Sequence, residues 1–110
     1  MDEGSSSAIE QAIRRMWVQF LPQLQERVTL MDTAARALAG GACAPEQLNE
    51  AYLAAHKLAG VLGTLGLMEG TSLAREAEIV FGAGAARASA ECVRLEAIAV
   101  QLRQMIENRQ

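Results

Sequence analysis

The stretch Ala54–Leu67 reads AAHKLAGVLGTLGL and places the chain's only histidine, His56, inside a helical pattern. Apolar residues recur on one face of this stretch, which is typical of an amphipathic helix. Gly60 and Gly63 nevertheless interrupt it, although glycine in a helix interior costs roughly 1 kcal/mol relative to alanine. These glycines therefore indicate a place beside the imidazole where another group must come close.

The rest of the chain also has apolar residues spaced three or four positions apart. Strong helix formers dominate, and Pro22, Gly40–Gly41, Gly66–Gly70 and Gly82–Gly84 separate the helical stretches. Pro45 suits a first helical position, and Thr71 or Ser72 could cap the next helix. Five stretches are expected to be helical, with apolar faces that run over Ile9–Phe20, Leu24–Leu38, Leu48–Leu62, Leu73–Val80 and Ala88–Ile106. The third helix is expected to begin at Pro45 and the last to continue to about Asn108.

Short connections between helices of similar length favour antiparallel neighbours. The predicted fold is therefore all-α, an antiparallel up-down four-helix bundle with a short additional N-terminal helix. Residues 1–7 are predicted to be a polar leader or linker, and residues 8–110 to form the bundle. Trp17, Phe20 and the methionines Met16, Met31, Met68 and Met105 are expected to fill the core.

Composition limits the possible functions. A 110-residue chain is expected to be one domain, or one domain cut from a longer chain, and its net charge of −3, without a basic patch, argues against nucleic-acid binding. No apolar run is long enough to span a membrane and no signal peptide is evident, so a cytoplasmic location is expected. Cys43 and Cys92 fit free thiols, and with a single histidine they do not make a metal site.

Successive residues of a helix are about 100° apart around its axis. Measured from the apolar face of the helix expected over Leu48–Leu62, His56 lies near the boundary of the core. Gly60 and Gly63 lie on the same flank, whereas Lys57 and Thr64 point to solvent. An imidazole can be a general base, a metal ligand or a covalent nucleophile. Covalent carriage of a group needs no substrate cavity in this chain, but a surface histidine beside incidental glycines fits the same pattern.

These residues resemble the histidine-containing phosphotransfer (HPt) domains of two-component phosphorelays. The resemblance rests on a histidine followed by lysine, spaced glycines and a leucine, and on the helix that follows. The matching positions are His56, Lys57, Gly60, Gly63, Gly66, Leu67 and the segment Leu73–Glu78.

The resemblance implies a phosphocarrier without autokinase activity. Nε2 of His56 would take a phosphoryl group from an aspartyl phosphate on a receiver domain and pass it to another receiver's aspartate. The domain itself would bind no cofactor, because the receiver supplies Mg²⁺. Lys57 would support the charge, Gly60 and Gly63 would allow close approach, and the receiver would dock on Leu53, Ala59, Val61 and Thr64.

One position departs from the family pattern. Many members have a lysine three residues after the histidine, where this chain has Ala59, and this predicts a weaker local field. Two other functions remain open from the sequence. One is a helical interaction or dimerisation module without phosphotransfer, and the other is the substrate domain of a chemotaxis-type histidine kinase.

Overall fold

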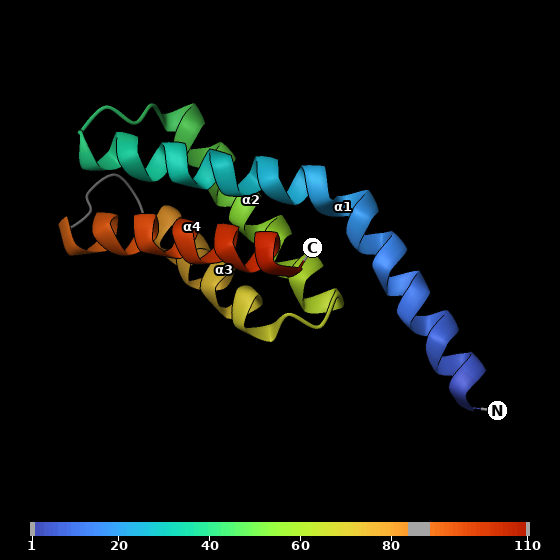
Figure 1. Ribbon diagram of the computed structural model, residues 1–110. Helices are drawn as coiled ribbons and strands as arrows, with labels where there is room; N and C mark the ends of the chain where they lie inside the picture. Colours follow the sequence, from blue (N-terminus) through green and yellow to red (C-terminus); the bar gives the residue numbers. More distant parts are fainter. Residues whose placement is uncertain (1, 84–88, 110) are drawn as a thin grey trace.

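The computed structural model describes residues 2–83 and 89–109, which form four helices and no strand (Figure 1). The helices are α1 (Asp2–Ala39), α2 (Pro45–Thr64), α3 (Met68–Phe81) and α4 (Ser89–Arg109). Over these residues, α1 packs against α2 and α4, and α3 packs against the same two helices. Each helix thus contacts its two neighbours in a ring, which confirms the predicted all-helical bundle.

The N-terminal part of the fold differs from the prediction. Residues 2–39 form one continuous helix with Pro22 inside it, so the separate leading helix is wrong. A proline removes only one backbone hydrogen bond, and the buried residues Trp17 and Leu24 hold both sides of Pro22 in the bundle. Figure 1 shows α1 bending near the point where its first turns leave the bundle. The residues expected to be a leader, from Asp2 to Ser7, belong to this helix.

The core runs along the axis of the bundle and uses one face of every helix. Small residues such as Ala51, Ala55 and Ala59 let α2 lie close to its neighbours, while larger side chains fill the centre. Trp17 and Met31 are buried and Met16, Phe20 and Met105 pack partly against the core, as expected. Met68 is 65% exposed at the start of α3, so its prediction as a core residue is wrong. The largest fully buried side chains are Phe81, Leu24, Met31, Leu58, Leu62, Leu95, Ile98, Leu102, Ile106 and Val28.

The connection between α2 and α3 is tight. Gly66 has a φ of +81°, and the backbone N–H of Leu67 donates to the carbonyl oxygen of Leu62 at 2.8 Å. This pattern ends a helix with a left-handed residue, for which glycine is the natural choice. α3 then starts at Met68, earlier than the sequence suggested, so Gly70 is a helical residue rather than part of the turn.

The predicted cap at Thr71 or Ser72 is also wrong. Thr71 is buried within α3, and α3 begins after Leu67 without a side-chain cap. Gly70 lies where a Cβ atom would come within 2.9 Å of side-chain atoms of Leu62 and Met105, so close packing explains it. Ala88, expected on the apolar face of the last helix, lies outside the described residues.

Candidate functional site

His56 lies on the outer face of α2, with 66% of its side chain exposed. Ala55 and Ala59 on either side of it are buried, so α2 turns its core face away from the imidazole. The helix register deduced from the sequence is therefore correct: the only histidine is accessible at the edge of the core.

A carboxylate holds the ring from the neighbouring helix. Nδ1 of His56 and Oε2 of Glu78, on α3, are 2.8 Å apart. An ionised carboxylate only accepts hydrogen bonds, so Nδ1–H is the donor. In a neutral ring, Nε2 then keeps its lone pair, and the exposed ring presents a nucleophilic nitrogen. Only 21% of the Glu78 side chain is exposed, so neighbouring atoms cover most of it.

The register of α3 against α2 places Glu78 there. The hydroxyl of Thr71 donates a buried hydrogen bond of 3.0 Å to the carbonyl oxygen of Ala59. The two helices are antiparallel, so residues further along α3 lie opposite residues earlier on α2. The same Oγ1 lies 3.2 Å from the position of a Cβ atom on Gly63, so Thr71 is level with Gly63. Seven residues after Thr71 along α3 and seven before Gly63 along α2, Glu78 comes level with His56. The contacts of Thr71 with α2 thus hold the register that aligns acceptor and ring.

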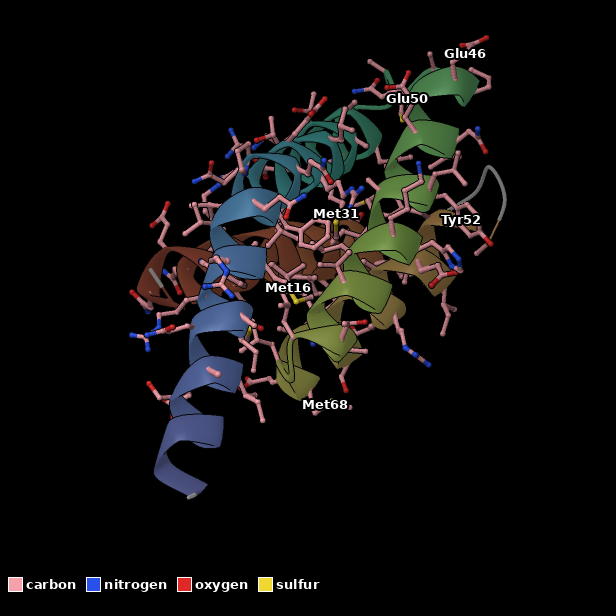
Figure 2. All side chains as sticks on the ribbon, turned by 90° about the vertical axis from the view of Figure 1, so that its right-hand side faces the viewer. Met16, Met31, Glu46, Glu50, Tyr52 and Met68 are labelled. Atoms are coloured by element: carbon pink, nitrogen blue, oxygen red, sulfur yellow. The ribbon has the colours of Figure 1, made fainter. Side chains whose placement is uncertain are left out.

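His56 stands between two open hollows. One, of about 590 Å³, lies between α2 and α3; it is called the polar hollow because the charged residues Arg75 and Glu78 line it, together with Tyr52 and Gly82. The other, of about 520 Å³, lies between α1 and α2, and Met16, Phe20 and Val61 give it an apolar wall. Figure 2 shows Met16 on the side of α1 that faces α2, and Tyr52 on the opposite side of α2.

Gly60, one turn after His56, lines both hollows. A Cβ atom built at Gly60 would meet nothing within 4 Å, so the backbone lies open beside the ring. Gly63 differs, because its Cβ atom would lie 3.2 Å from Oγ1 of Thr71. Gly63 therefore makes room for α3, and its prediction as a second site for close approach of a partner is not supported by this packing.

The residues predicted to support the charge and to dock the receiver differ in how exposed they are. Lys57 is exposed and lines the apolar hollow together with Thr64, on the α1 side of His56. Leu53 is 42% exposed, and Val61 is half-buried. Ala59 is only 4% exposed, so it lies on the floor of the polar hollow and offers a partner very little surface.

Two residues of this site, Glu78 and Arg75, were not singled out from the sequence as functional. Both lie on the face of α3 that borders the polar hollow, and both belong to the segment Leu73–Glu78 that resembles the family's following helix. Spacing within α3 could show that they share a face, three residues apart. Only the register between α2 and α3 shows that this face meets His56.

Other kinds of site find no support among residues 2–83 and 89–109. No group of three or more potential metal ligands occurs there, and neither Cys43 nor Cys92 forms a disulfide among these residues. No described helix has the length and apolar character needed to cross a membrane.

Comparison with protein families agrees with this geometry. The family model of the Hpt domain matches residues 15–110, which include all of the site. The chain therefore belongs to the Hpt family, whose members are phosphocarriers in two-component signalling with receiver domains as partners. The comparison with curated proteins found no match, and neither did the comparison with solved structures.

Proposed function

We propose that this chain is the intermediate of a multistep phosphorelay, in which His56 takes a phosphoryl group from one receiver domain and gives it to another. The observation that carries the proposal is the exposed imidazole whose Nδ1–H is donated to Glu78. This arrangement leaves Nε2 as the nucleophile. The open backbone at Gly60 leaves room beside that nitrogen for the donor domain.

In the forward step, the lone pair of Nε2 attacks phosphorus while the bond from phosphorus to the aspartyl oxygen breaks. The receiver's aspartate leaves as a carboxylate, and the proton on Nδ1 stays in place. The imidazole ring acquires positive charge as the N–P bond forms, and the Glu78 carboxylate 2.8 Å away stabilises that charge. Transfer to a second receiver reverses these bond changes on a new aspartate.

Other parts of the transfer chemistry would come from the partner. We propose that the chain binds no cofactor of its own and that the partner receiver contributes the Mg²⁺ that stabilises the transferring group. The chain would then have no autokinase activity. The same proposal puts the chain in the cytoplasm, where the receiver domains of such relays act.

Two parts of the surface are candidates for docking the receiver. The apolar wall formed by Met16, Phe20 and Val61 lies next to His56, and Leu53 and Thr64 are exposed on the same helix as the histidine. Exposed apolar side chains that surround a reactive group suit a transient protein contact. A helical interaction module would have no need for an oriented, nucleophilic imidazole at the centre of that surface.

The test uses isolated receiver domains that a ³²P-labelled small phosphodonor has phosphorylated in the presence of Mg²⁺. It measures transfer of the labelled phosphoryl group from these receivers to the chain. The chain should acquire label that is lost in acid and kept in base, and a second, unphosphorylated receiver should remove it. His56→Gln should abolish the label, whereas Arg36→Gln, at the far end of α1, should leave it unchanged.

Three outcomes would contradict the proposal. Labelling of the His56→Gln variant would show a different acceptor. Label stable in acid would exclude phosphohistidine. Labelling only by a histidine kinase domain with ATP, and by none of the receivers, would favour the kinase-substrate alternative.

A further inference from the structure

We infer that Arg75 is a binding residue for the phosphoryl group on His56 and takes the place of the lysine that many members have at the position of Ala59. This inference rests on the proposed function, because it concerns the charge that the phosphorylated ring would need. It assigns a role to a residue on a different helix from the histidine.

Arg75 faces the same polar hollow as the reactive ring. The hollow is lined by His56, Ala59 and Gly60 from α2, and by Arg75 and Glu78 from α3. On α3, Arg75 lies one turn before Glu78, which contacts the ring. Because α3 runs antiparallel to α2, Arg75 is level with the residues just after His56, where the open backbone of Gly60 lies.

The guanidinium is also free to bind an anion. Arg75 is exposed, and within the described part of the chain it forms no hydrogen bond or ion pair. Arg94 differs in this respect, since its guanidinium is held by both carboxylate oxygens of Glu76. An arginine without a partner beside a nucleophile is suited to a phosphoryl group, which it can bind through two parallel hydrogen bonds.

Charge balance at the site favours this assignment. A phosphoryl group on Nε2 adds negative charge close to the carboxylate of Glu78. Lys57 lines the hollow on the α1 side of His56 and does not line the hollow that contains Glu78. Among the described residues, Arg75 is the only arginine or lysine that lines the Glu78 hollow. The two cations thus flank the ring from opposite sides.

The missing lysine fits the same picture. Ala59 lies on the floor of this hollow, so a lysine at that position would extend into the space that Arg75 borders. The aliphatic part of such a lysine could lie against the floor while its ammonium group reached solvent. Arg75 from α3 and a lysine from α2 would therefore bring positive charge to the same place.

The experiment measures how fast phosphoramidate, a small donor, phosphorylates His56. Nε2 forms a bond to phosphorus, the P–N bond of the donor breaks, and ammonia leaves. This donor removes receiver docking from the measurement. Arg75→Ala should lower the rate about three- to tenfold, because a partly exposed charge-assisted contact is lost. Arg75→Lys should keep part of the rate.

A more stringent test moves the positive charge from position 75 on α3 to position 59 on α2. In the Arg75→Ala background, Ala59→Lys should restore much of the rate, whereas Ala59→Gln, of similar length but neutral, should not. Arg14→Ala is the charge control, because this exposed residue lines none of the hollows around His56. Circular dichroism and thermal unfolding check that each variant is folded.

The outcomes separate this inference from the proposed function. If Arg75→Ala reacts as fast as the unsubstituted chain, or if the charge control slows the reaction equally, the role of Arg75 is refuted and the phosphocarrier stands. Rescue by Ala59→Gln to the same extent as by Ala59→Lys would also refute it. If neither receivers nor phosphoramidate phosphorylate the unsubstituted chain at His56, the proposed function itself fails.

Discussion

Gly60→Ala should make this protein more stable and a poorer phosphocarrier. The added Cβ atom would meet nothing within 4 Å, so no steric cost opposes the better helix propensity of alanine. The gain in free energy of unfolding should be about 0.5–1 kcal/mol, since the residue lies inside α2. For a domain of this size that corresponds to a rise in Tm of roughly 2–6 °C.

The cost of this substitution should arise in the complex with a receiver. The new methyl group would occupy the open backbone beside His56, where the donor domain must approach. Inserting one methyl group into a closely packed contact typically costs about 1–3 kcal/mol. If the transition state for transfer bears that cost, the rate should fall roughly 5- to 150-fold.

Two measurements on the same variant test both effects. Urea or thermal denaturation gives the stability, and rapid-quench labelling from a phosphorylated receiver gives the transfer rate. Phosphoramidate, which needs little space, should phosphorylate Gly60→Ala at nearly the normal rate. Gly63→Ala is the matched control, because its methyl group would press on Thr71 and should bring no comparable gain in stability.

A stabilised Gly60→Ala variant that accepts phosphoryl from receivers as fast as the unsubstituted chain would show that the receiver does not approach closely at Gly60. Close approach there would also be refuted if phosphoramidate and receivers were slowed equally. In that case the methyl group would be acting on the ring itself rather than on the contact with a partner.

Substitutions at three further residues of α3 test the site and the packing of this helix. Glu78→Ala should slow phosphorylation by phosphoramidate roughly tenfold because Nδ1 loses its acceptor, and Glu78→Gln should be intermediate; equal rates in all three proteins would count against orientation of the ring by this side chain. Thr71→Val should lower the free energy of unfolding by about 1–2 kcal/mol in urea, because the carbonyl oxygen of Ala59 loses a buried donor; an unchanged midpoint would contradict this. The hydrogen bond from Arg94 lowers the pKa of the Glu76 carboxyl in the folded protein. The stability that this pair contributes should therefore be fully present above the pKa that Glu76 has in the unfolded chain. It should disappear as the pH falls through the lowered pKa of Glu76 in the folded protein. Glu76→Gln should therefore be less stable than the unsubstituted chain at pH 7 and no different in acid, whereas an equal loss at both pH values would exclude this linkage.

Much of the fold could be predicted from the sequence because the signals are local. Apolar spacing locates α2 and α4, and glycines mark the ends of α1 and α3. The exposure of His56 follows from the same spacing, since one buried face fixes the direction of every other side chain on the helix. Pro22 misled the prediction because packing on both sides keeps α1 continuous.

The rest of the site depends on how two helices align, which local spacing does not determine. Gly63 looked like a partner of Gly60, but α3 lies against it, and Thr71 looked like a cap although its hydroxyl is buried. Glu78 reaches the ring only because of this alignment. A shift of α3 by one turn along α2 would leave the sequence signals unchanged and remove the acceptor.

In the proposed phosphocarrier, Nε2 of His56 carries the phosphoryl group while Nδ1–H stays bonded to Glu78. Because the chain has one histidine, selective ¹⁵N-histidine labelling gives NMR signals from this ring alone. After phosphorylation by a receiver, ³¹P–¹⁵N coupling should appear on Nε2, and Nδ1 should remain protonated. Coupling on Nδ1, or phosphorylated protein without any coupled histidine nitrogen, would contradict phosphorylation of His56 at Nε2.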